Sequence, residues 1–469
     1  GGAAAAAYTI NQSCRFNLAD AAKLTASSFG TPTSTKIKSC SFWFKRSLVD
    51  DSENPYLFHW DTSASGQMYF ETTGKLIISD QNVDVLKTNR VFRDPTAWTH
   101  VLFLVDTSQA TAADMYTLYI NGVEETSFAT DNRASISQDS TTKWGGAVAA
   151  VIAGRATSGA TFDGYLADVV LLDGTVGTVG SFGKTDDYGA FVPVNPSALT
   201  FGDNGFHLDF ANSSALGNDV SGNDNDWTVA NLAANDQVLD SPTDVLDNSI
   251  GNYCTFNPLR MGSGTLSEGN LKYTTVETVS SVCGTHPIFP GMKVRFEFYP
   301  AGDSDNFDNH IGIIEVDKVA GADMGNNVPR GGTVALDAYD LNPAVAGGSK
   351  GVRYVRNNTY SSVLADCDPG DTIGVYFDNS AGTLKFTIED GALVSAATGI
   401  DTTKTWVVVH CSASTSSYTG ASINFGQLDY EEDSVDTTYK DLATHNYPAP
   451  AILDPSAHVQ ATIYTGTGT

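Results

Sequence analysis

The stretch WTHVLFLVDTSQATAADMYTLYINGVE (98–124) contains two runs rich in aromatic and branched residues. HVLFLV (100–105) and YTLYING (116–122) follow the period of two that is typical of a half-buried β-strand. Asn121 and Gly122 form the pair preferred in a two-residue hairpin loop, because both residues tolerate positive φ. The stretch therefore predicts antiparallel strands joined by a tight turn.

The same signal recurs along the chain, in runs of five to eight residues bounded by Gly, Asn, Asp or Ser. The further runs are SFWFK (41–45), YLFHW (56–60), YLADVVLL (165–172), VRFEFY (294–299), TIGVYFD (372–378), TLKFTIED (383–390) and TWVVVHC (405–411). Because helical periodicity is almost absent, we expect an all-β protein built from antiparallel β-sandwiches.

Composition agrees with folded β domains and restricts the partners. The 469 residues are 41% hydrophobic, enough to fill the cores of two large β domains. Asp and Glu number 54 against 26 Lys and Arg, a net charge of −28, so the average surface repels phosphate groups. We therefore expect no nucleic-acid partner. No apolar run approaches the roughly 20 residues that span a bilayer, and we expect no membrane insertion.

The six cysteines are scattered without a CxxC pair or zinc-type Cys–His spacing. They are Cys14, Cys40, Cys254, Cys283, Cys367 and Cys411. Cys40 and Cys411 lie inside apolar strand patterns, where a cysteine behaves as a small buried hydrophobe. We expect free thiols throughout.

Turn-rich sequence in the middle of the chain suggests domain boundaries. Residues 201–250 include GNDVSGNDNDW (217–227) and LDSPTDVLDN (239–248), which show little strand pattern. We expect a β domain over 1–200, a polar connector over 201–250 and a second β domain over 251–428. Prolines in residues 429–469 favour an extended C-terminal tail that lies on the fold or on a neighbour.

Three ordered stretches of the first half resemble a concanavalin A-like sandwich of the laminin-G-like group: SCSFWFKRS (39–47), the hairpin stretch (98–124) and FDGYLADVVLLDG (162–174). The second half resembles the SPRY-like sandwich through PGDTIGVYFDNSAGTLKFTIEDG (369–391) and TWVVVHCSASTSSYTGASINFGQ (405–427). The resemblances imply two jelly-roll domains.

Three further segments look like parts of bacteriophage virion proteins: AYTINQSCRFN (7–17), LDFANSSALGNDVSGNDNDWT (208–228) and NYPAPAILDPSAHVQATIYTGTG (446–468). This resemblance implies a protein on the phage particle surface, as a tail fibre or related appendage that contacts host surface glycans. Its partners would be other virion proteins and further copies of itself, as a trimer in the case of a fibre. The alternatives are a capsid or tail decoration protein and a polysaccharide depolymerase.

The residues argue against catalysis. Laminarinase-like relatives of the concanavalin A fold carry E-x-D-x-x-E on one strand, which points the acids into a cleft. The nearest string here starts at Glu315 and Asp317 but has Ala320 in place of the last acid. The histidines accompany no nucleophile elbow, and we expect His100 and His410 to be packed in the core. We therefore expect no enzyme.

Two acidic loops could bind calcium, which prefers hard oxygen ligands. The first holds Asp219, Asn223, Asp224 and Asp226, and the second holds Asp303, Asp305, Asp308 and Asn309. Neither loop has EF-hand spacing, and the alternative is a set of Asx turns within a polar loop. No other cofactor is expected.

Glycan binding by a sandwich uses exposed aromatic rings and polar side chains on loops or on a concave face. The candidate contacts are Tyr56, Trp60 and Trp144 in the first half, and Tyr354, Arg356 and Tyr360 in the second. The alternative for each aromatic residue is partial burial in the core.

Overall fold

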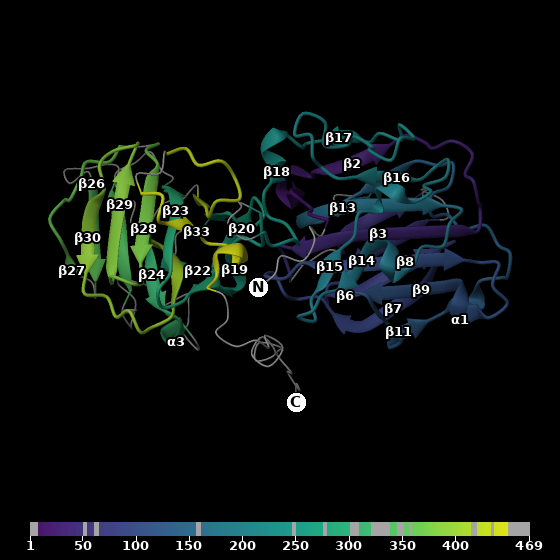
Figure 1. Ribbon diagram of the computed structural model, residues 1–469, viewed down its shortest axis with the longest axis horizontal. Helices are drawn as coiled ribbons and strands as arrows, with labels where there is room; N and C mark the ends of the chain where they lie inside the picture. Colours follow the sequence, from purple (N-terminus) through teal and green to yellow (C-terminus); the bar gives the residue numbers. More distant parts are fainter. Residues whose placement is uncertain are drawn as a thin grey trace.

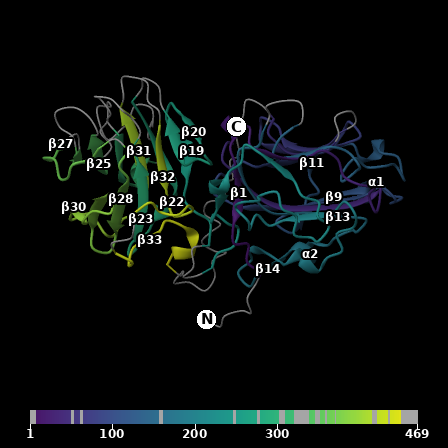
Figure 2. The same cartoon turned by 90° about the horizontal axis from the view of Figure 1, so that it is seen from above.

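The chain folds into two β-sandwiches that lie side by side along its long axis (Figures 1 and 2). The computed structural model describes residues 8–49, 54–60, 65–155, 161–245, 250–274, 279–300, 309–319, 338–344, 351–356, 359–368, 370–413, 420–432 and 436–448.

The first sandwich consists of two antiparallel sheets and a small hairpin. One sheet pairs, in this order, β10 (Val123–Glu124), β9 (Tyr116–Ile120), β8 (Thr99–Asp106), β3 (Ile37–Arg46), β13 (Gly164–Asp173), β1 (Ser13–Phe16) and β18 (Gln237–Val238), with β16 (Phe206–Leu208) also on β13. The other pairs β11 (Phe128–Asp131), β7 (Val83–Val91), β6 (Lys75–Asp80), β5 (Gly66–Phe70), β4 (Tyr56–Trp60), β12 (Ala150–Ile152), β2 (Lys23–Ala26) and β17 (Thr228–Ala230). The hairpin pairs β14 (Gly183–Thr185) with β15 (Phe191–Pro193).

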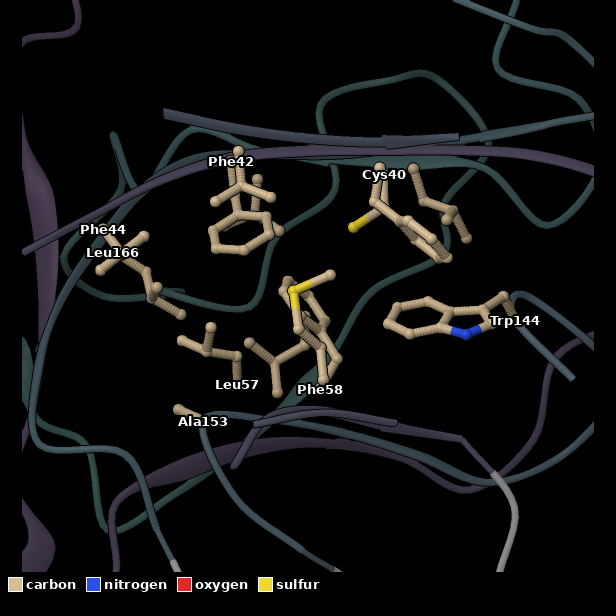
Figure 3. Packing of buried hydrophobic residues seen from close by; sticks show 14 of the residues in the cluster. Cys40, Phe42, Phe44, Leu57, Phe58, Trp144, Ala153 and Leu166 are labelled. Atoms are coloured by element: carbon tan, nitrogen blue, oxygen red, sulfur yellow. The ribbon is translucent and has the colours of Figure 1, made fainter. Parts of the chain in front are cut away.

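Aromatic and branched side chains fill the space between these two sheets (Figure 3). Phe42 from β3 meets Phe58 from β4 edge to face, with ring centroids 4.9 Å apart. Trp144 packs 5.1 Å from Phe103 and 5.2 Å from Trp60. Such aromatic pairs stabilise a core beyond the area that they bury.

The second sandwich has the same two-sheet architecture. One sheet pairs β19 (Phe256–Met261), β22 (Val279–Ile288), β31 (Trp406–Ala413), β24 (Asn309–Glu315), β25 (Tyr339–Ala344), β26 (Gly351–Arg356) and β27 (Thr359–Tyr360). The other pairs β20 (Thr265–Ser267), β21 (Lys272–Thr274), β32 (Ala421–Asn424), β23 (Lys293–Tyr299), β28 (Ile373–Asp378), β29 (Thr383–Ile388) and β30 (Val394–Thr398). A short strand, β33 (Lys440–Asp441), adds to β23 in parallel.

Helices are short wherever the structure describes the chain. The α-helical turns are α1 (Ala112–Met115), α2 (Val179–Phe182) and α3 (Val316–Val319), and the 3₁₀ turns are Leu18–Asp20, Arg133–Ser135, Pro196–Ala198, Ala234–Asp236 and Thr444–Asn446. In the described ranges, none of these helices has the length and apolar character needed to cross a membrane.

The nine strand runs predicted from the sequence all form strands. Asn121 and Gly122 have φ values of 48° and 75°, as the predicted hairpin turn requires. All six cysteines are buried free thiols, as their sequence contexts predict. His100 and His410 are buried in packed strands, also as predicted.

The prediction of a connector over residues 201–250 is wrong for most of that segment. Its short strands β16, β17 and β18 pair with β13, β2 and β1 of the first sandwich. Phe206 and Trp227 are buried in the same core as the rest of that sandwich. The segment therefore completes the first domain, because it supplies both edge strands and core side chains.

A buried lysine of the first sandwich joins it to the start of the second. The Lys45 ammonium on β3 donates hydrogen bonds to Asp240 (2.7 Å), to the Asn252 side chain (2.7 Å) and to the Tyr253 carbonyl (3.0 Å), so all three of its protons have acceptors. The indole of Trp98 donates to the other oxygen of Asp240 (2.8 Å). Asp240 and Lys45 are 0% and 1% exposed, so every atom of the pair depends on these partners.

A turn of the second sandwich, residues 268–270, extends this junction. The hydroxyl of Tyr165 donates to the Gly269 carbonyl (2.6 Å), and Asn270 donates to the Ser47 carbonyl (2.8 Å). Gly269 has φ of 65°, and a Cβ there would lie 2.2 Å from the Tyr165 hydroxyl oxygen, so only glycine fits. Arg15 forms an ion pair with Glu268 at 3.2 Å.

We predict that Lys45→Met lowers the free energy of unfolding by about 3–5 kcal/mol, because it leaves Asp240 buried without its counter-charge. Lys36→Met is the matched control, since the Lys36–Asp139 pair is exposed and contributes at most about 1 kcal/mol. Urea unfolding measures both values. Equal small effects for the two variants would contradict this description of the junction.

Stability will also fall in mild acid. Burial lowers the pKa of His100, His286 and His410 to about 3, from an ordinary value of 6.5. Between pH 6.5 and about 3, these histidines bind protons in the unfolded chain but not in the folded chain. The free energy of unfolding therefore falls by about 1.4 kcal/mol per histidine for each pH unit. Urea unfolding midpoints at about pH 7.5 and 5.5 measure this effect. The midpoint should be lower at the acid pH, and His410→Gln should reduce the difference. Equal midpoints at the two pH values would disprove the prediction.

Candidate functional site

The predicted glycan contacts of the first sandwich are largely inside the protein. Trp60 and Trp144 are 0% exposed and belong to the core between the sheets. Figure 3 shows Trp144 in this core. The structure therefore corrects the expectation for these two residues, because neither ring has a face that a ligand could reach. Tyr56 is on the outer face of its sheet but is itself buried, stacked on Tyr69 at 4.8 Å with the Arg155 guanidinium 5.3 Å from its ring.

Two of the three candidates in the second sandwich lie together. Tyr354 and Arg356 are two residues apart in β26 and are both half-buried. Tyr354 stacks with Tyr339 at 6.4 Å, and the Arg356 guanidinium lies 4.0 Å from the centre of the same Tyr339 ring. Burial raises the pKa of Tyr354 to about 12. Tyr360 is elsewhere, because it pairs with Val355 and contacts His310 on the opposite face of the sheet.

The carboxylate of Asp219 is occupied by its own chain. It accepts hydrogen bonds from the backbone N–H groups of His207 (2.8 Å), Ser221 (2.9 Å) and Asn225 (3.0 Å), and from the Ser221 hydroxyl (2.8 Å). Asp226 accepts from the backbone N–H of Asp219 (2.8 Å). This is the network of Asx turns that was the alternative to calcium binding.

The other predicted calcium ligands do not complete a site. The Asn223 amide donates to the Gly202 and Gly205 carbonyls, and Asp224 is exposed. In the part of the chain that the structure describes, no three His, Cys, Asp or Glu side chains converge as metal ligands would. In the second acidic loop, Asp303, Asp305 and Asp308 lie outside the described residues, while Asn309 is buried in β24.

The incomplete acid string also has a structural explanation. Glu315 ends β24 and pairs with Lys404 at 2.7 Å and with Lys318 at 3.7 Å. Asp317 follows in α3, and Ala320 lies outside the described residues. Glu315 is thus part of a surface ion-pair group.

A cleft of about 790 Å³ lies between the two sandwiches, beside the buried junction. It combines polar side chains from both domains. The first sandwich contributes Gln12, Ser213, Ala234, Asn235, Gln237, Val238 and Leu239. The second contributes Tyr299, Ser422, Asn424, Gln427, Leu428, Asp429 and Glu431.

Backbone and side-chain contacts hold the bottom of the cleft closed. The Leu239 N–H donates to the Gln427 carbonyl across the domain boundary at 2.9 Å. Gln427 in turn donates to the Cys254 carbonyl (3.2 Å), and Leu428 packs against the apolar cluster that includes Trp43 and Trp98. The two walls are therefore fixed relative to each other, which reduces the entropy lost when a ligand binds.

A compact turn places the polar groups of the second wall. Asn424 donates to the carbonyls of Leu428 and Asp429 at 3.1 Å and accepts from the Gly426 N–H at 2.9 Å. Gly426 has φ of 110°, and a Cβ there would lie 2.4 Å from the Asp441 carboxyl carbon. The turn thus requires glycine, and it presents the exposed Asp429 and Glu431 to the cleft.

Buried Glu297 anchors the chain behind that wall. One oxygen of its carboxylate accepts from the Tyr299 hydroxyl (2.6 Å) and the Glu431 N–H (2.9 Å), and the other accepts from the Glu432 N–H (2.8 Å). Thr372 donates to the Glu431 carboxylate at 2.6 Å. Burial and the neighbouring Glu297 raise the pKa of Tyr299.

The chemistry of the cleft suits hydroxyl-rich ligands. Its amides and hydroxyls donate and accept hydrogen bonds, its two carboxylates accept them, and the Tyr299 ring offers a partly exposed apolar surface. Both acids come from one segment of one wall. Glycoside hydrolysis needs two carboxyl groups that flank the bond, and the described residues of the facing wall supply none.

Sequence reasoning missed this cleft completely. Its residues come from several separate segments, and its polar residues lie singly in loops and short strands, where such residues are common. The available signal was the acidic stretch DYEE (429–432), which comes shortly after the SPRY-like stretch 405–427.

Comparisons with known proteins agree with the β-sandwich architecture. Residues 15–177 match the profile of the family described as the concanavalin A-like lectin/glucanases superfamily. No curated protein sequence matches the chain.

Three solved structures are similar to parts of this chain. The SPRY domain of human HERC1 is 15% identical, covering 36% of this chain and 96% of that one, with a TM-score of 0.28. The PSpry domain of TRIM65 is 12% identical over 38% of this chain and 90% of its own, with a TM-score of 0.27. A heptameric SAP-like pentraxin from Limulus polyphemus is 15% identical over 36% and 80%, with a TM-score of 0.25.

The predicted fold class is confirmed. The protein is nearly all β, with antiparallel sheets arranged as two sandwiches. The concanavalin A-like match falls within the first sandwich.

For the Asp219 loop we predict that Asp219→Asn lowers the free energy of unfolding by about 1–3 kcal/mol, because an amide NH₂ would face a backbone N–H donor. Asp224→Asn, in the same loop but exposed, should change it by less than about 0.5 kcal/mol. Millimolar calcium should leave the wild-type melting temperature unchanged. A calcium-dependent rise in melting temperature that Asp219→Asn abolishes would restore the metal-site interpretation.

Proposed function

We propose that this protein is a non-enzymatic component of a bacteriophage particle that holds glycans of the host surface in the cleft between its sandwiches. The observation that carries the proposal is the cleft itself, where amide and hydroxyl groups from both domains and two carboxylates from the second surround about 790 Å³ next to a tyrosine ring. Glycans offer hydroxyls for hydrogen bonds and C–H faces for aromatic contact, so this lining is complementary to them.

The absence of opposed acids supports binding without cleavage. Asp429 and Glu431 are two residues apart on the same wall, and the facing wall offers only uncharged side chains among its described residues. A sugar held here would contact carboxylates on one side only. This arrangement favours a lectin-like role over a depolymerase.

The resemblance of residues 7–17, 208–228 and 446–468 to phage virion segments supports a location on the particle surface. The partners would then be other virion proteins together with a host glycan. Several copies on one particle would convert weak single-site binding into stable attachment. Homo-oligomerisation, as a trimer in a fibre, belongs to the same proposal.

Binding to immobilised bacterial surface polysaccharides tests the role of the cleft. We predict that Asn235→Ala weakens binding about fivefold, which corresponds to the loss of one hydrogen bond of about 1 kcal/mol. Gln138→Ala removes an exposed amide outside the cleft and is the matched control. If the two variants bind alike while the wild type binds the polysaccharide, the cleft is not the glycan site.

Particle imaging tests the location. Antibody labelling of intact particles should mark the tail or an appendage, and the free chain should adsorb to host cells and block infection. Labelling confined to the capsid lattice would favour a decoration protein instead. Reducing ends released from the polysaccharide would favour a depolymerase.

A further inference from the structure

The cleft between the sandwiches has a pronounced charge asymmetry. Asp429 and Glu431 are exposed on the second wall, whereas the residues that line the first wall carry no charge. Among the described lining residues there is no lysine, arginine or histidine. A ligand in the cleft therefore meets negative charge on one side and neutral amides and hydroxyls on the other.

The backbone of both acids is held in place, and so is the Glu431 carboxylate. The backbone N–H of Glu431 is held by buried Glu297 at 2.9 Å, and its carboxylate accepts from Thr372 at 2.6 Å. The carbonyl of Asp429 accepts from the Asn424 amide at 3.1 Å. Both residues are thus positioned by contacts that exist before any ligand arrives.

Two arginines near the cleft are already used by the chain. Arg15 is buried and pairs with Asp236 at 3.0 Å and with Glu268 at 3.2 Å. Arg295 is buried, pairs with Glu297 at 3.2 Å and lies 4.1 Å from the centre of the Tyr430 ring. Neither guanidinium is placed to neutralise an anionic ligand.

We infer that the cleft selects neutral glycans and excludes those that carry carboxylate, sulfate or phosphate groups. This inference rests on the proposed glycan-binding function and names its ligand class. A neutral sugar can direct hydroxyl donors to Asp429 and Glu431 and use the amides of Asn235 and Gln237 on its other side. An acidic sugar would place like charges at contact distance in a partly enclosed site, where water screens them poorly.

The test is an array of oligosaccharides of equal length, probed with the full chain. Each neutral oligomer is paired with its acidic counterpart, galactan with oligogalacturonate and glucan with oligoglucuronate. The wild type should bind the neutral member of a pair at least tenfold more tightly than the acidic member. Asp429→Asn with Glu431→Gln removes both negative charges and should reduce the ratio of neutral to acidic binding at least fivefold.

The matched control is Asp114→Asn with Glu124→Gln, which removes the same charge from two exposed acids outside the cleft. It should leave the discrimination unchanged. Equal binding of neutral and acidic oligomers to the wild type, or the same loss of discrimination in both double variants, would overturn the inference.

Adsorption of the chain to host cells separates this inference from the function on which it rests. If the chain adsorbs and blocks infection but the array shows no neutral preference, the inference fails and the adhesin function stands. If the array shows the predicted preference while intact particles lack the protein, the ligand class stands and the virion role fails.

Discussion

The contacts on which the rest of the structure depends are those of buried Lys45, which pairs with Asp240 at the junction of the two sandwiches. Lys45 belongs to a central strand of the first domain, whereas two of its three acceptors, Asn252 and Tyr253, lead into the second. Because a buried charge is stable only with complete hydrogen bonding, these contacts specify one relative position of the domains. The turn at residues 268–270, which meets Tyr165 and Ser47, supports the same position.

The cleft is a consequence of that fixed geometry. Its walls belong to different domains, so their spacing is set by the junction and not by either fold alone. Within the second wall, Asn424, Gly426 and Glu297 determine where Asp429 and Glu431 lie. Buried polar groups thus act in two places, first to orient the domains and then to orient the side chains that would contact a ligand.

The sequence predicts the strands well, because alternation and the Asn121–Gly122 turn are local signals. It failed for residues 201–250, where strands of two or three residues are too short to show periodicity. The sequence-based interpretation of Trp60 as a glycan contact was also wrong. A β-bulge in β4 shifts the register between Tyr56 and Phe58, so Tyr56 faces outward while Trp60 faces the core. The cleft could not be predicted from the sequence, because it forms only where distant segments of the two domains come together.

The most direct test of this account is hydrogen–deuterium exchange of the full chain with and without a bound neutral oligosaccharide. The account predicts slower exchange on ligand binding in both walls, at residues 234–239 of the first sandwich and 422–431 of the second. Protection confined to one sandwich, or to the Tyr354–Arg356 region of β26, would contradict the claim that the two domains form one shared binding site.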